Sequence, residues 1–167
     1  YLEEETLSFR RFYPKVIVSY ATGRRENLDA LGSGPGMWYA SLVIQSLFKN
    51  GCPCMSGLMI PAGTSWEMYF LRIAKARVLV VLLTEAYLRS IPCLNEVHAA
   101  IKKGVDIIPI RVDDSGDSEI SRDETRMWPT DVIGDNDDLE LKRFTVLEKL
   151  ASLNTLPARG TLLSVRE

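Results

Sequence analysis

The stretch "VLVVLLTEAYLRSIPCLNEVHAAIKKGVDIIPIRV", residues 78–112, decides the fold class. Residues 78–83 are continuously apolar without alternation, which is typical of a strand buried on both faces of a parallel sheet. A segment of helical periodicity follows, and residues 106–112 then return to a strand-like composition. Pro109 removes one backbone donor from this second strand, which favours a bulge or an edge position. The stretch therefore predicts a strand, a helix and a strand of an open α/β sheet.

The same alternation extends toward the N-terminus. The pattern predicts strands at residues 15–20 and 54–59 and helices at residues 38–50 and 66–76. Gly51 stands where a glycine commonly follows a helix, and Thr64 or Ser65 is placed to cap the next one. Strands that alternate with helices predict an open parallel sheet with right-handed crossovers. Ligands of such sheets bind at the carboxyl ends of the strands.

Composition indicates one domain with a core, since 46% of the 167 residues are hydrophobic. The formal charge of −2 lacks the basic excess that nucleic-acid binding usually needs. Residues 113–140 carry 11 acidic and 2 basic side chains, a net charge of −9, so the rest of the chain is +7. That positive remainder suits an anionic ligand, and a solvated acidic loop beside an ordinary surface explains the pattern equally well.

The three cysteines have no spacing typical of a zinc site, so a reducing, cytoplasmic setting and no metal are expected. No apolar run approaches the ~20 residues of a membrane span. After residue 113 the chain is acidic and interrupted by glycine and proline, which predicts irregular structure up to residue 138. Helical periodicity returns at residues 141–153.

Two segments resemble the TIR domain family: "KVIVSYATG" (15–23) and "GLMIPAGTSWEMYFLRIAKARVLVVLLTEAYLRSIPCLNEVHAAIKKGVDIIPIRV" (57–112). The family commonly has a first strand that ends in Ile-Ser-Tyr, a Ser-x-Trp-Cys-x-x-Glu motif and Ile-x-Pro-Ile in the fourth strand. This chain departs from the motif at Pro92, where the tryptophan stands, and at Thr84, where a serine follows the third strand. The resemblance implies a flavodoxin-like, open, parallel five-stranded sheet flanked by helices.

The domain that this resemblance implies spans residues 15–155, with an N-terminal flank at 1–14 and a C-terminal tail at 156–167. Its acidic region, 113–140, matches the family poorly. The family contains non-catalytic adaptors, which act through homotypic contacts, and enzymes, which cleave NAD+ at the bond between nicotinamide and ribose. The essential residue of the enzymes is the glutamate of the motif, which corresponds to Glu96.

The resemblance therefore implies an NAD+ hydrolase or cyclase that is activated by self-association, in immune or cell-death type signalling. NAD+ would be its substrate, and no cofactor is expected. The products would be nicotinamide and ADP-ribose or a cyclic ADP-ribose isomer. A non-catalytic TIR module that contacts other TIR domains is the alternative. A nucleoside deoxyribosyltransferase-like enzyme fits the motifs less well, and a receiver domain is excluded because no acidic cluster follows residues 16–20.

One glutamate suffices chemically for this reaction, because nicotinamide leaves as a neutral pyridine and needs no general acid. The positive charge that develops on the ribose calls for one carboxylate close to it. Ser90 and Pro92 are suited to begin the helix that contains Glu96, which shares a helical row with Cys93 and Ala100. By spacing alone, a glutamate favoured by the helix dipole is the simpler interpretation.

The resemblance also implies which residues surround the substrate: Ser19, Tyr20, Arg24, Arg25, Trp66, Thr84 and Cys93. Each also has an ordinary explanation. Tyr20 then simply ends a strand, Trp66 pins its helix to the core, and the two arginines are solvated. His98 is predicted to be a surface or packing residue. The self-association loop that the family implies contains Ile60, Pro61, Ala62 and Gly63.

Overall fold

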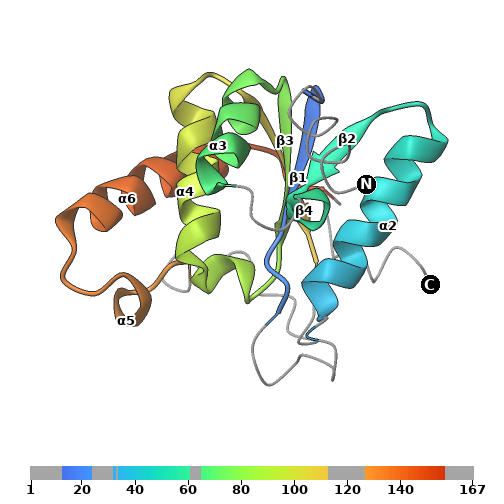
Figure 1. Ribbon diagram of the computed structural model, residues 1–167. Helices are drawn as coiled ribbons and strands as arrows, with labels where there is room; N and C mark the ends of the chain where they lie inside the picture. Colours follow the sequence, from blue (N-terminus) through green and yellow to red (C-terminus); the bar gives the residue numbers. More distant parts are fainter. Residues whose placement is uncertain (1–12, 24–31, 33, 61–64, 113–126, 157–167) are drawn as a thin grey trace.

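A parallel sheet of four strands lies at the centre of the molecule (Figure 1). The computed structural model describes residues 13–23, 32, 34–60, 65–112 and 127–156. Within them the strands are β1 (Val16–Ser19), β2 (Cys54–Ser56), β3 (Val78–Leu83) and β4 (Asp106–Arg111), in the order β2-β1-β3-β4. All neighbouring strands run parallel. The predicted α/β class is thus confirmed.

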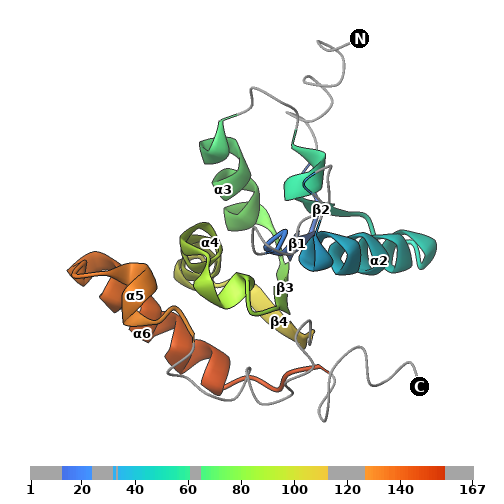
Figure 2. The same ribbon diagram turned by 90° about the horizontal axis from the view of Figure 1, so that it is seen from below.

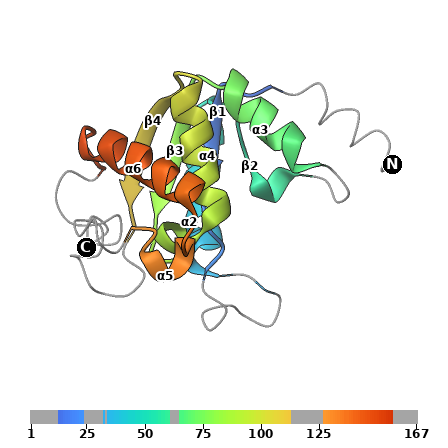
Figure 3. The same ribbon diagram turned by 90° about the vertical axis from the view of Figure 1, so that its left-hand side faces the viewer.

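Helices cover both faces of this sheet (Figure 2). Helix α2 (Pro35–Lys49) lies on one face, and α3 (Trp66–Lys75) and α4 (Ile91–Lys102) lie on the other. Helix α6 (Asp137–Ala151) packs across the outer side of α4 (Figure 3). Short helices complete the described chain: η2 (Gly57–Met59), η3 (Tyr87–Arg89) and α5 (Thr130–Ile133). None of the helices in these ranges combines the length and the apolar character that crossing a membrane requires.

The family resemblance implies five strands, whereas the described ranges contain four. The position of the missing strand is held by one residue, Leu156, which pairs in parallel with Ile110 on the free edge of β4. The Leu156 amide donates to the Pro109 carbonyl at 2.9 Å, and its carbonyl accepts from Arg111 at 2.6 Å. A single residue pair is too short to count as a strand. Because β4 is outermost among the described strands, the edge position expected for Pro109 is confirmed.

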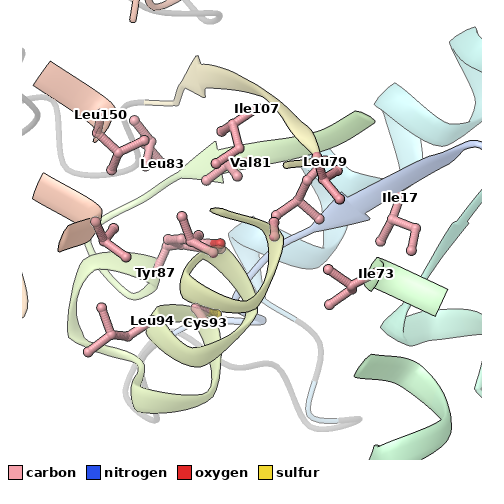
Figure 4. Packing of buried hydrophobic residues seen from close by; sticks show 14 of the residues in the cluster. Ile17, Ile73, Leu79, Val81, Leu83, Tyr87, Cys93, Leu94, Ile107 and Leu150 are labelled. Carbon is pink, nitrogen blue, oxygen red and sulfur yellow. The ribbon is translucent and has the colours of Figure 1, made fainter. Parts of the chain in front are cut away.

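The core forms because β3 is apolar on both sides. Leu79, Val81 and Leu83 pack toward α3 and α4, whereas Val80 and Leu82 pack toward α2. This division follows from the two-residue period of a strand, and it explains why β3 shows no polar alternation. Figure 4 shows the larger cluster, in which the strand residues meet side chains from α3, α4 and α6.

The helix boundaries agree with the predicted signals. The Ser90 hydroxyl accepts the backbone N–H of Cys93 at the start of α4, and Ser65 accepts that of Glu67 at the start of α3. Gly51 has a φ of +70° directly after the cap of α2, a conformation that glycine adopts without strain. The β3–α4–β4 unit predicted from residues 78–112 is therefore confirmed.

Candidate active site

Glu96 lies on the buried side of α4. Together with Cys93 and Ala100, it forms the helical row that faces the sheet, and only 7% of its surface is exposed. The helix begins at Ile91, so Glu96 stands in its second turn and turns inward rather than toward solvent. The simpler interpretation, a glutamate favoured by the helix dipole, does not account for this position, because Glu96 lies beyond the first turn and is buried.

Two hydroxyl groups donate to this carboxylate, and a third joins them through Ser19. Ser19, at the carboxyl end of β1, donates to Glu96 Oε2 at 2.6 Å. The Tyr69 hydroxyl, from α3, donates to the same oxygen at 3.5 Å. The Tyr87 hydroxyl, from η3, lies 2.7 Å from Ser19 Oγ. The group forms a buried polar cluster at the ligand-binding edge of the sheet, where strand order reverses between β1 and β3.

Burial dominates the electrostatics of this cluster. It raises the pKa of Glu96 to about 7, although the hydrogen bonds from Ser19 and Tyr69 lower it in part. Burial, and to a smaller extent the negative charge of Glu96, also holds the pKa of Tyr69 well above its ordinary value. For Tyr87, burial is again the main cause of a raised pKa. Both tyrosines therefore keep their protons near neutral pH, and Glu96 can exist there in either form.

Cys93 and Tyr20 join the end of β1 to the start of α4. The Cys93 thiol donates to the Tyr20 carbonyl at 3.7 Å, and burial followed by the charge of Glu96 raises the pKa of this thiol. The raised pKa keeps this thiol protonated near neutral pH, which disfavours a nucleophilic role. A contact between Cys93 and a substrate stays a prediction. The half-buried Tyr20 ring lies against Gly57. Burial, and to a smaller extent the negative charge of Glu96, raises the pKa of Tyr20 to about 12.

Trp66 lies at the rim of the cluster. Its side chain is 60% exposed, and its ring meets the Tyr69 ring edge-on with 5.6 Å between the centroids. A tryptophan that pins its helix to the core would be buried, so that interpretation does not hold. Trp66 instead covers the tyrosine that reaches Glu96, and it presents a free aromatic surface beside the site.

Thr84 is buried beneath the cluster, and its hydroxyl accepts the backbone N–H of Tyr87 at 3.1 Å. It thereby fixes the start of η3, which carries Tyr87. A contact between Thr84 and a substrate stays a prediction. His98 lies on another side of α4. Burial is the main cause of its lowered pKa, and the positive charges of Lys102 and Lys142 lower this pKa further. This position agrees with the packing role predicted for His98.

The remaining predicted residues fall largely outside the described ranges. Arg24, Arg25 and three residues of the predicted self-association loop, 61–63, lie outside them, so their roles stay predictions. Ile60, the first residue of that loop, is partly buried and packs against the larger core cluster. No group of three or more His, Cys, Asp or Glu side chains suited to a metal occurs within 13–23, 32, 34–60, 65–112 and 127–156.

Sequence reasoning missed three aromatic residues of this region: Tyr69, Tyr87 and Trp128. Trp128 is fully buried, donates from Nε1 to the Ser90 carbonyl at 2.9 Å and meets the Tyr87 ring edge-on at 6.2 Å. It thus supports the start of α4 and η3 together. Tyr69 falls within the predicted helix 66–76, but the destination of its hydroxyl group is a tertiary feature that helical spacing does not encode.

Comparison with known proteins identifies a matching family and solved structures of similar fold. A protein-family model described as "TIR domain" matches residues 37–144, which are 108 of the 167 residues. The matched part contains Trp66, Tyr69, Tyr87 and Glu96 and begins after β1, which carries Ser19. The fold is similar to that of the TIR domains of the activated Roq1 resistosome, which directly recognises the pathogen effector XopQ. The TM-score is 0.62 at 17% identity, over 86% of this chain and 87% of the other. No curated protein shows significant similarity.

Proposed function

The chain belongs to the TIR domain family, and we propose that it cleaves NAD+ at the bond between nicotinamide and ribose. The observation that carries this proposal is the buried carboxylate of Glu96 at the carboxyl edge of the sheet. Burial of a carboxylate is costly because desolvation disfavours its charge, so a carboxylate that is nevertheless buried points to a functional role. Among the described residues, the groups that offset this cost are hydroxyls, and no cation contributes to the pKa of Glu96.

The chemistry follows from the charge that develops during cleavage. The electron pair of the broken N-glycosidic bond stays on the ring nitrogen, so nicotinamide leaves as a neutral molecule and the ribose becomes positive. Ionised Glu96 would stabilise this positive centre and accept hydrogen bonds from the ribose hydroxyls. Attack by water, with loss of one proton, then gives ADP-ribose. Attack by an atom of the same molecule gives a cyclic isomer instead.

The aromatic rim supports the same proposal. Trp66 offers an exposed ring that contacts Tyr69, the residue whose hydroxyl group reaches Glu96. Planar aromatic rings stack with nicotinamide or adenine, so Trp66 is the residue that we assign to base recognition, together with Tyr20. Arg24 and Arg25, which follow β1 in the sequence, are proposed to pair with the pyrophosphate.

We propose in addition that the domain acts when it self-associates, in immune or cell-death type signalling. Besides Trp66 on α3, large apolar side chains remain exposed on α2, at Trp38 and Phe48, and on α6, at Leu141 and Phe144. Surfaces of this kind favour contacts between proteins. The TIR domains with a similar fold belong to the activated Roq1 resistosome, which is consistent with a signalling role. The same exposed surfaces also favour the second candidate, a non-catalytic TIR module that acts through homotypic contacts alone.

Incubation of the purified domain with NAD+ at high protein concentration separates the two candidates. The enzyme proposal predicts release of nicotinamide, measured by chromatography, and a rate that increases more than proportionally with protein concentration. In Glu96→Gln, which keeps the shape of the side chain, the rate should fall at least ~100-fold. Asp106→Asn, which changes an exposed carboxylate at the amino end of β4 and thus at the opposite edge of the sheet, serves as the matched control and should keep the rate. Absence of nicotinamide under assembling conditions would leave the non-catalytic module.

A further inference from the structure

The hydrogen bonds around Glu96 are asymmetric. Both of those that the carboxylate accepts from described residues reach Oε2: the short one from Ser19 at 2.6 Å and the longer one from Tyr69 at 3.5 Å. Oε1 receives no hydrogen bond from the described residues. Among the described residues, the protein therefore holds one oxygen of the carboxylate and leaves the other without a hydrogen bond.

The number of protons in the cluster determines the direction of its hydrogen bonds. A serine hydroxyl has one proton to donate, and Ser19 gives it to the ionised carboxylate. The Tyr87 hydroxyl, 2.7 Å away, must then donate to Ser19 Oγ. The chain runs from Tyr87 through Ser19 to Glu96, and each donor polarises the next one. When Glu96 binds a proton on Oε2, the same three groups reverse, with Glu96 donating to Ser19 and Ser19 to Tyr87.

Among the described residues, the Ser19 hydroxyl group contacts only Glu96 and Tyr87 through hydrogen bonds. Only 1% of its surface is exposed, and it lies on the face of β1 that packs toward α4, in register with Val81 of β3. A buried hydroxyl among aliphatic neighbours is costly unless its hydrogen bonds are made. An aliphatic residue would fill this position of the strand equally well. Packing therefore does not require the hydroxyl group of Ser19, and its presence points to a functional role.

We propose that Ser19 is a positioning residue, and that its hydroxyl, supported by Tyr87, fixes Oε2 of Glu96 and leaves Oε1 to face the ribose. This inference rests on the proposed function for the identity of the ligand but not for the geometry. It differs from the predicted role of Ser19 as a substrate contact, because the hydroxyl is committed to two protein groups. The titratable groups around Glu96 are Tyr20 on the loop after β1, Tyr69 on α3, Tyr87 on η3 and Cys93 on α4.

The test is a ¹³C NMR titration of the Glu96 carboxyl carbon in the ligand-free domain, with the signal assigned by its loss in Glu96→Gln. Removal of a hydrogen bond to a charged carboxylate should raise the titration midpoint of Glu96 in Ser19→Ala by about one pH unit. Tyr87→Phe deletes a single oxygen and should raise the midpoint less. The matched control is Ser56→Ala, a second buried serine, which pairs with Val18 and therefore lies on the face toward α2. It should leave the midpoint in place.

The same variants are then assayed for nicotinamide release, where the acid limb of the rate should move upward together with the midpoint. A Glu96 midpoint in Ser19→Ala equal to that in Ser56→Ala overturns the inference. If Ser19→Ala does not fold, Tyr87→Phe decides in the same way. Midpoints that move as expected in a domain that releases no nicotinamide support the positioning role and reject the proposed reaction. Nicotinamide release without any change of the Glu96 midpoint rejects the positioning role and supports the proposed reaction.

Discussion

The two faces of the sheet bury clusters of different kinds. The cluster toward α2 consists of small and aliphatic side chains: Val18, Ala40, Ile44, Cys54, Val80 and Leu82. The cluster toward α3 and α4 is larger and contains two buried tyrosines, whose hydroxyl groups meet Ser19 and Glu96. The buried cluster that holds α2 against this sheet contains no ionisable group other than a cysteine. The polar groups on the other face therefore add a cost in stability that packing does not require, as is common at functional sites.

The largest expected difference between the faces is in the cost of a cavity. Leu94 is fully buried on α4, so Leu94→Ala should lower the free energy of unfolding by about 3–5 kcal/mol. Ile44 is 7% exposed on α2, beside a smaller cluster that can collapse more easily, so Ile44→Ala should cost about 2–3 kcal/mol. Urea denaturation of both variants measures the difference. Equal costs would mean that the two faces are packed equally tightly.

The next effect concerns the buried carboxylate. Because the pKa of Glu96 is raised to about 7 from an ordinary value of 4.5, the native state binds its proton more tightly than the unfolded state does. Stability should therefore decrease as the pH rises from about 4.5 to about 7, by on the order of 3 kcal/mol from this group. Glu96→Gln carries no charge and should be more stable than the wild type at pH 8 by roughly that amount.

Denaturant titrations at about pH 4 and about pH 8 check this expectation, since the two proteins should differ little at the lower value. The substitution also exchanges activity for stability, because it removes the proposed catalytic group. A Glu96→Gln domain that is no more stable than the wild type at the higher pH would mean that burial does not penalise this carboxylate.

The smallest effect is expected on the outer side of α2. Trp38 is 53% exposed and Phe48 is 47% exposed, so Trp38→Ser and Phe48→Ser remove little buried area from the monomer. The free energy of unfolding should change by less than about 0.5 kcal/mol. Self-association, measured by analytical ultracentrifugation, should weaken in both variants if this surface contributes to it. A large loss of monomer stability would instead show that these side chains support the fold.

The fold was predictable where a local pattern reports burial. Residues 78–83 are apolar throughout because both faces of β3 are covered, and that requirement is visible in the sequence alone. The orientation of α2 was harder to predict from the sequence, because its exposed side, with Trp38, Leu42 and Phe48, is as apolar as its buried side. Ala40 belongs to the cluster between α2 and the sheet, whereas Gly36 lies against the backbone of Ala21 in the loop after β1, where a side chain would collide with it. The fifth strand was expected from the family, and Leu156 alone occupies its position.

The candidate site was predictable only in part. The motif identified Glu96, and helical spacing placed it on the row of Cys93 and Ala100, which is the buried row. The hydroxyl groups that reach Glu96 come from residues 27 and 77 positions away in the sequence, and spacing carries no information about such convergence. Trp128 follows a long acidic segment, so nothing near it in the sequence indicated a contact with Ser90 and Tyr87.

The most direct measurement is the rate of nicotinamide release as a function of pH, from about pH 5 to about pH 9, for the wild type and for Glu96→Gln. If ionised Glu96 stabilises the ribose cation, the wild-type rate should be constant above about 7 and should fall roughly tenfold per pH unit below it. Glu96→Gln should release nicotinamide at least ~100-fold more slowly at every pH above about 7. A wild-type rate that does not depend on pH across this range, or a rate in Glu96→Gln close to that of the wild type, would contradict the assignment of Glu96 as the catalytic residue.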